Sequence, residues 1–135
     1  QYVFPDAQER YELSPLHFYP ILEYGLRFGE VLTTGESVRG VGVWLPPGAT
    51  DVTEARAAAA GLDRVAEKIG EAATNRFFGV LGFLEPFHAR DAPGPHWYTM
   101  VVLGRTKQRN SGRLAAYRVM LRQAAVFFGQ STAAR

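Results

Sequence analysis

The stretch that decides the fold is residues 95–104, which read Pro-His-Trp-Tyr-Thr-Met-Val-Val-Leu-Gly. Aromatic and β-branched residues dominate this stretch, and such side chains favour the pleated backbone of a strand. They fall on both faces of an extended chain, as in a strand that neighbouring elements cover from two sides. We therefore predict a central strand over Trp97–Leu103.

A hairpin is predicted upstream of that strand. Glu30–Thr34 has the pattern of a short strand, and Thr34–Ser37 supplies a turn. The second strand, Val38–Leu45, carries apolar residues on both faces, so we expect it to lie in the interior of a sheet. Residues 46–48, Pro-Pro-Gly, end it sharply.

Helices are predicted on both sides of the hairpin. The first begins near Pro5 with acidic residues in its first turn, and it continues toward Gly29 with interruptions near Pro15 and Pro20. The last covers about residues 112–128. The order of helix, hairpin, helices, strand and helix predicts an α/β (α+β) fold with a small mixed sheet.

Residues 51–89 also have a helical pattern. Asp51 is predicted as the N-cap, with Glu54 three residues later completing a capping-box-like pair. Two glycines, Gly61 and Gly70, are expected to divide the run into two or three helices. In the last of these, one face at helical spacing carries Phe77, Leu81, Leu84 and His88.

The composition is that of one packed domain. The chain has 135 residues, of which 47% are hydrophobic, and we expect a single domain over residues 1–135. It contains no cysteine, which excludes disulfides, Cys-type zinc sites and a thiol nucleophile. No apolar run is long enough to span a membrane and no signal peptide opens the chain, so we expect a cytoplasmic protein with no membrane partner.

Charge is distributed unevenly along the chain. Residues 1–91 carry 8 basic and 13 acidic side chains, whereas residues 92–135 carry 7 basic side chains and no acid. Such a polarised basic segment suggests a polyanionic partner, either a phosphorylated cofactor or a nucleic acid. A solvated helix face explains the same charge pattern equally well.

Two motifs resemble one branch of the GNAT superfamily of acetyl-CoA-dependent N-acetyltransferases, the branch of puromycin N-acetyltransferase-like enzymes. Residues 40–48, Gly-Val-Gly-Val-Trp-Leu-Pro-Pro-Gly, look like the end of the third strand there. Residues 95–104 are similar to the fourth strand, P-H-W-Y-L-x-x-L-G-V. The helices between the motifs and the opening segment, residues 2–29, also look like those of that branch. The resemblance covers residues 1–104 and implies a GNAT-like mixed sheet flanked by helices.

The remainder departs from the family pattern. The strand and helix that open the family fold would precede Gln1, and the strand and helix that close it have no counterpart after Gly129. After Gly104 the family has a turn of the form Q/R-x-x-G-x-G/A, and Arg109–Leu114 satisfies only the Arg and the first Gly. We therefore expect a version of the fold that is incomplete relative to the family.

The resemblance implies transfer of an acetyl group from acetyl-CoA, as co-substrate, to a primary amine of a small molecule. Backbone groups of the 97–103 strand would bind the pantetheine arm, and the turn before the last helix would bind the pyrophosphate, since helix N-termini attract anions. The cofactor-binding residues expected on this basis are Met100, Val101, Val102, Leu103, Arg109, Asn110, Ser111, Gly112, Arg113 and Leu114.

Three residues are candidates for proton transfer. Glu30, which begins the hairpin, and His96, which precedes the central strand, are candidate bases or water relays for the amine. Tyr98 is a candidate proton donor to the leaving thiolate. Each also has a structural interpretation: an exposed strand-end acid, a hydrogen-bonded histidine and a packing aromatic.

Aromatic residues of the first helix and the hairpin are candidates for an acceptor pocket, namely Tyr24, Phe28 and Trp44. Core packing is the alternative for each of them. His88 is expected to be a core or boundary histidine, and His17 has no partner in sequence. The three histidines have no metal-ligand spacing, so no metal is expected.

Three functions therefore remain open. The first is the acetyltransferase, and the second is a catalytically impaired GNAT-like binding module that acts as a homodimer. The third is a nucleic-acid-binding protein that uses the basic residues 105–135. It ranks last, because neither stacking aromatics nor a reading helix is evident.

Overall fold

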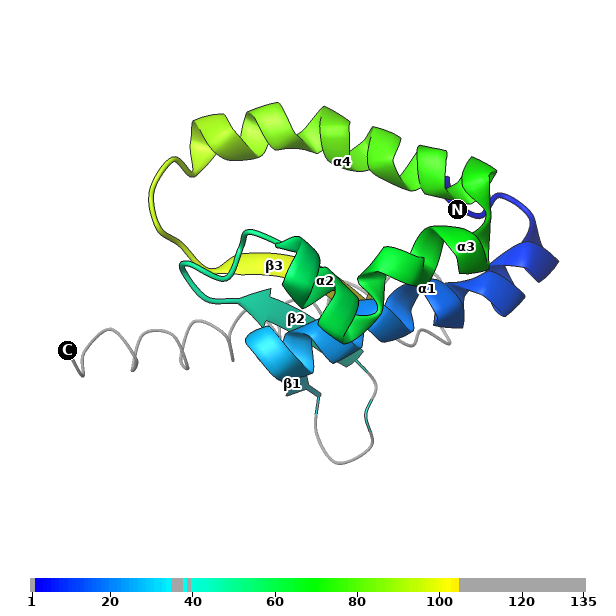
Figure 1. Ribbon diagram of the computed structural model, residues 1–135, viewed down its shortest axis with the longest axis horizontal. Helices are drawn as coiled ribbons and strands as arrows, with labels where there is room; N and C mark the ends of the chain where they lie inside the picture. The colour runs from blue at the N-terminus through cyan, green and yellow to red at the C-terminus, as the bar shows by residue number, and fades with distance from the viewer. Residues whose placement is uncertain (1, 35–37, 39, 105–135) are drawn as a thin grey trace.

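The computed structural model describes residues 2–34, 38 and 40–104, and this part of the chain has an α+β fold. A small antiparallel sheet lies beside a group of helices, and one long helix runs at a distance from the sheet (Figure 1). In chain order the elements are α1 (Ala7–Phe28), β1 (Glu30–Thr33), β2 (Gly40–Leu45), α2 (Glu54–Ala60), the 3-10 helix η1 (Leu62–Arg64), α3 (Val65–Ile69), α4 (Glu71–Asp91) and β3 (Tyr98–Gly104).

The strands pair in the order β1-β2-β3, and both pairings are antiparallel. The prediction that the second hairpin strand lies inside a sheet is confirmed, because β2 pairs on both edges. The predicted central strand, β3, instead lies at an edge of the sheet that the described residues form. A parallel pairing, which a mixed sheet requires, is not found among these three strands.

A β-bulge interrupts the pairing of β2 with β3. Val43 pairs with Val101 and the next residue, Trp44, pairs with Thr99, so Met100 has no pairing partner on β2. A bulge of this kind bends the strand and increases its twist, and bulges are common beside active sites. The start of β3 is thereby turned relative to the rest of the strand.

Helix α1 is continuous, and the predicted interruptions near Pro15 and Pro20 do not occur. Asp6 caps its N-terminus, since the carboxylate accepts a hydrogen bond of 2.8 Å from the backbone N–H of Glu9. The helix contacts β1, β2, α2 and α3, and this packing along its length outweighs the cost of two missing backbone donors. The approach to the sheet is close at Gly25, where a Cβ would overlap Val43.

The helices after the hairpin begin and break at specific residues. The N-cap is Thr53 rather than the predicted Asp51, because the Thr53 hydroxyl accepts the hydrogen bond from the Arg56 N–H. The predicted breaks are confirmed at Gly61 and Gly70, whose φ angles of 75° and 81° lie in the region that favours glycine.

Two groups of buried residues form the core. One joins the N-terminal segment to α3 and α4 through Phe4, Ile69 and Ala73. The other joins α1, β2 and α2 through Tyr24, Leu45 and Ala60, and the partly buried Phe28, Leu62, Tyr98 and Met100 pack against it. The second group therefore fixes the start of β3 against the helices.

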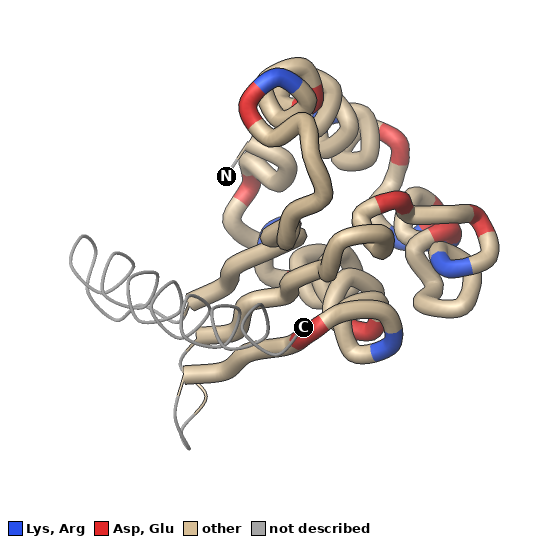
Figure 2. The backbone as a smooth tube through the Cα atoms, turned by 90° about the vertical axis from the view of Figure 1, so that its left-hand side faces the viewer, with Lys and Arg blue, Asp and Glu red and all other residues tan. Residues whose placement is uncertain are grey.

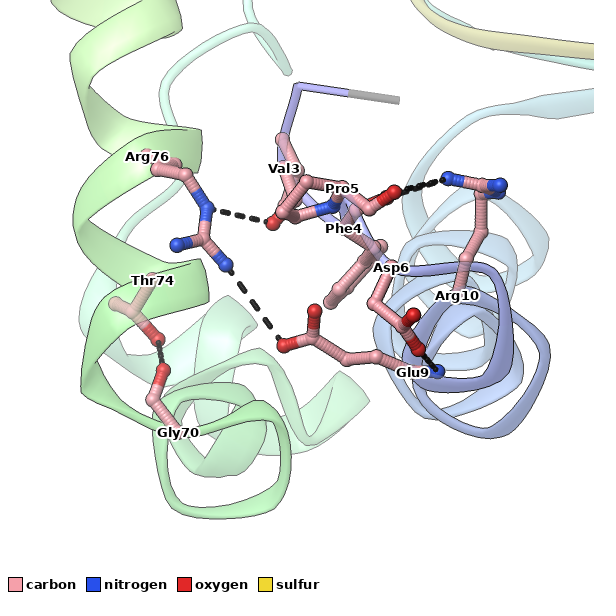
Figure 3. A network of polar contacts seen from close by, with 9 residues as sticks. All are labelled: Val3, Phe4, Pro5, Asp6, Glu9, Arg10, Gly70, Thr74 and Arg76. Carbon is pink, nitrogen blue, oxygen red and sulfur yellow. Dashed lines mark hydrogen bonds and ion pairs between the residues drawn. The ribbon is translucent and has the colours of Figure 1, made fainter.

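Helix α4 is anchored in its first turns, and its last turn is held by a contact between His88 and His96. The Arg76 guanidinium donates a 2.8 Å hydrogen bond to the Val3 carbonyl and lies 3.7 Å from the Glu9 carboxylate (Figure 3). Beyond this anchor the apolar residues of the helix are exposed: Phe78, Val80, Leu81, Phe83, Leu84 and Phe87. No helix in the described ranges is long and apolar enough to cross a membrane.

Candidate functional site

Two of the three predicted catalytic residues lie together where the chain returns from α4 to the sheet. His96 precedes β3, Tyr98 begins it, and the ring of His88 from the last turn of α4 lies between them. The His88 ring centroid is 4.9 Å from that of His96 and 5.0 Å from that of Tyr98. These three side chains, here called the histidine cluster, form the candidate site.

Hydrogen bonds fix the orientation of both imidazole rings. Nδ1 of His96 lies 2.6 Å from the carbonyl oxygen of Gly94, and the Nε2 atoms of His88 and His96 are 2.8 Å apart. A carbonyl oxygen can only accept, so His96 Nδ1 carries a proton and donates it. The cluster is therefore a hydrogen-bonded chain that runs from α4 through His96 to the backbone at Gly94.

The third predicted catalytic residue, Glu30, lies on the far strand of the sheet. Its pairing partner is Trp44, and Trp44 in turn pairs with Thr99 of β3. Glu30 is thus at the same end of the sheet as Tyr98, but β2 separates them by two strand spacings, about 10 Å. The structure does not bring Glu30 into contact with the histidine cluster.

The predicted cofactor-binding backbone, Met100 to Leu103, lies within β3. One edge of the strand pairs with β2, and no other strand of the described chain pairs with its second edge. Charged residues lie mainly on the helices and loops, whereas the strands are almost uncharged (Figure 2). The predicted phosphate-binding turn, Arg109 to Leu114, lies outside the described residues.

The predicted acceptor-pocket residues lie in the core. Tyr24 is completely buried, and its ring packs 4.9 Å from that of Phe28. Its hydroxyl is buried and has no hydrogen-bond partner within the described part of the chain. Phe28 is half-buried under the Arg56 guanidinium at 5.6 Å, and Trp44 is buried in β2. Through Tyr98, which packs against the same core, Tyr24 and Phe28 support the base of the histidine cluster.

The remaining histidine, His17, has a structural environment. It is buried in α1 among the rings of Phe4, Phe18 and Phe77, with centroid distances of 5.9, 4.8 and 4.6 Å. Burial lowers the pKa of His17, because the apolar surroundings disfavour the charged imidazolium. His17 is therefore part of the aromatic packing between α1, α4 and the N-terminal segment.

Metal binding has no support in the part of the chain that is described. No group of three or more His, Asp or Glu side chains there could hold a metal ion. The histidine cluster supplies two imidazole nitrogens that already bond to each other.

The sequence predicts His88 in the core or at its boundary, whereas the structure places it on the exposed end of α4. The signal that could have identified it is its spacing from His96. The two residues are separated by a loop containing Pro-Gly-Pro, which reverses the chain and brings a helix end against a strand start.

Comparison of the chain with family models, with curated proteins and with solved structures returned no match.

Proposed function

We propose that this chain is a GNAT-like N-acetyltransferase, which moves an acetyl group from acetyl-CoA to a primary amine of a small molecule. The observation that carries the proposal is the second edge of β3. This edge pairs with no described strand, the strand is bulged at Met100, and two predicted catalytic residues lie at its start. The reaction itself, acetyl transfer from acetyl-CoA, is proposed because residues 40–48 and 95–104 resemble motifs of the GNAT superfamily.

A strand edge is suited to a pantetheine arm. The arm is an extended chain with two amides, and an unpaired strand edge offers N–H and C=O groups at matching intervals. Charged residues are scarce on the strands, which suits an arm that is itself uncharged (Figure 2). An N–H beside the thioester would also stabilise the oxyanion of the tetrahedral intermediate, which is worth about 3–4 kcal/mol per donor.

The reaction needs one base and one acid. The amine nitrogen attacks the thioester carbonyl carbon, the new C–N bond forms, and the C–S bond breaks. A base takes the proton that the nitrogen loses, and the sulfur leaves as a thiolate that accepts a proton. The histidine cluster offers an imidazole for the first proton and the Tyr98 hydroxyl for the second.

The test is calorimetric titration with acetyl-CoA, followed by an assay for free thiol in the presence of primary amines. We expect saturable binding and amine-dependent thiol release. Gly112→Trp, in the predicted phosphate turn, should abolish binding. The same substitution at Gly79, around which α4 has open space, should leave it intact.

The alternative, a binding module without turnover, predicts a different result in the same experiment. It gives weak binding of acetyl-CoA or none, and no thiol release for any amine. Absence of binding by the parent protein therefore contradicts the transferase and favours the binding module.

A further inference from the structure

The contact between His88 and His96 determines which of their ring nitrogens is free to accept a proton from a substrate. The Nε2 atoms are 2.8 Å apart, so between them they share one proton, with one nitrogen as donor and the other as acceptor. Two N–H groups or two lone pairs facing each other at this distance would repel. The two rings are therefore one proton-sharing unit.

The carbonyl of Gly94 determines which of the two Nε2 atoms carries the shared proton. His96 Nδ1 must carry a proton to donate at 2.6 Å to that oxygen, so in neutral His96 the Nε2 atom has the lone pair. His88 Nε2 then carries the shared proton and donates it. In neutral His88 this leaves Nδ1 as the unprotonated nitrogen of the unit.

The position of His88 agrees with a role at the surface of a site. The residue is exposed, whereas His96 is half-buried between His88 and the loop backbone. A substrate that approaches from solvent therefore reaches His88 before His96. The ring of His88 also faces that of Tyr98 at 5.0 Å, beside the bulged start of β3.

We propose that His88, which the sequence analysis did not select, is the general base of the acetyl transfer and that His96 is its positioning residue. This inference rests on the proposed function. The His96 Nε2 lone pair holds the His88 ring in the Nε2–H tautomer, and the Gly94 carbonyl holds His96 in turn. His96 thus orients the base His88, as the third residue of a hydrolytic triad orients the catalytic histidine.

The proton balance of the step is simple. As the amine nitrogen forms its bond to the acetyl carbon, His88 Nδ1 takes the proton that the nitrogen loses. His88 becomes an imidazolium whose Nε2–H still donates to His96, so no ring has to move. When the C–S bond breaks, the thiolate takes a proton from Tyr98. The site is restored when His88 gives its proton to solvent and the Tyr98 phenolate takes one proton from solvent.

Several charged or titratable groups lie near His88 on α4, on the loop and on β3. On α4 these are Glu85, one turn earlier, and the Arg90–Asp91 ion pair, whose closest atoms are 2.6 Å apart. From the loop and β3, His96 and Tyr98 face the ring. Arg90 lowers the pKa of Asp91 through this pair, so the two charges largely offset each other.

The tautomers provide a test that needs no substrate. Nitrogen NMR of the ¹⁵N-histidine-labelled full chain at pH 8.5 should show His96 protonated at Nδ1 and His88 protonated at Nε2. In His96→Leu, His88 should lose its fixed tautomer and show a mixture. His96 protonated at Nε2, or His88 protonated at Nδ1, would overturn the inference.

Kinetics then separate the base from the residue that positions it. His88→Ala should lower kcat by about 10²- to 10⁴-fold with little change in acetyl-CoA affinity, and added imidazole should restore part of the rate. His96→Leu should lower kcat by about tenfold, the value of one hydrogen bond. His96→Gln should recover most of that loss, because its amide oxygen can accept from His88.

The control is Asn75→Ala, an exposed change on the same helix that should leave kcat unchanged. Circular dichroism of each variant checks that the helix persists. An active parent protein whose His88→Ala variant keeps full kcat overturns this inference alone. A parent protein that neither binds acetyl-CoA nor releases thiol overturns the proposed function, and the role of His88 with it.

Discussion

Helices α1 and α4 are nearly equal in length, at 22 and 21 residues, and both contain proline. Their packing is nevertheless opposite. Helix α1 buries five residues against the sheet, the other helices and the N-terminal segment, namely His17, Pro20, Ile21, Tyr24 and Gly25. Helix α4 buries only Ala73, and beyond it Phe83 is 69% and Leu84 50% exposed.

The difference lies in what each helix faces rather than in its own sequence. On α4, Ala73, Val80 and Phe87 are spaced by seven residues, so they lie on one stripe, yet only the first is packed. Packing holds α1 along its length, whereas α4 depends on its anchored start and on the His88–His96 bond at its end. We therefore expect α4 to open locally at lower free energy than α1.

The largest contrast is expected for truncation of leucine. Leu45→Ala, at a fully buried residue of β2 under α1, should lower the free energy of unfolding by about 2–5 kcal/mol. Leu84→Ala, on the exposed stripe of α4, should change it by no more than about 0.5 kcal/mol. Urea denaturation followed by circular dichroism measures both. Equal losses would show that α4 is packed as α1 is.

Glycine substitution gives the next contrast, with opposite signs. Gly25→Ala should cost about 1–3 kcal/mol, because the added Cβ overlaps Val43 and crowds Val31. Gly79→Ala has open space around it and should stabilise the protein by about 0.5–1 kcal/mol through helix propensity. Thermal melts of the two variants give the sign directly. A destabilising Gly79→Ala would contradict the exposed position of α4.

Arginine substitution distinguishes the anchored start of α4 from its exposed end. Arg76→Ala should cost about 1 kcal/mol, since it removes the 2.8 Å bond to the Val3 carbonyl. Arg90→Ala removes an exposed pair with its neighbour Asp91 and an exposed contact with the Phe87 ring at 5.5 Å, and it should cost less than Arg76→Ala. Denaturation midpoints of the two variants compare them, and a larger effect at Arg90 would reverse the assignment of the anchor.

The smallest effect expected is a pH dependence that arises in α1. Burial lowers the pKa of His17 in the folded protein, whereas the unfolded chain keeps the ordinary value of 6.5. The unfolded state therefore binds more protons as the pH falls below that value, and stability decreases. His17→Phe should show a weaker loss of stability between pH 7 and pH 5. An unchanged pH dependence would mean that His17 has the same pKa in the folded and the unfolded protein.

The sequence predicted the structural features that depend on local chemistry. The strand pattern of residues 97–103 and the breaks at Gly61 and Gly70 depend on side-chain shape and glycine conformation, and the structure confirms them. The interruptions at Pro15 and Pro20 were wrong because distant packing keeps α1 helical. The predicted N-cap, Asp51, was wrong because a second residue able to cap the helix, Thr53, follows two residues later, and the sequence alone does not decide between them.

The site was harder to predict because its members meet through tertiary structure. His96 and Tyr98 belong to one motif, and sequence placed them together. Their contact with His88 depends on where α4 ends and how the following loop reverses. The edge position of β3 likewise depends on which strands pair across the fold, and no local pattern of residues encodes that choice.

The central claim is that the second edge of β3 binds the thioester cofactor, and amide hydrogen exchange tests it most directly. Without ligand, alternate amides between Met100 and Leu103 should exchange rapidly, while those bonded to β2 are protected. Saturating acetyl-CoA should protect the rapid ones, and CoA lacking the acetyl group should do so as well. Amides that are all protected without ligand, or unchanged by acetyl-CoA, would contradict the account.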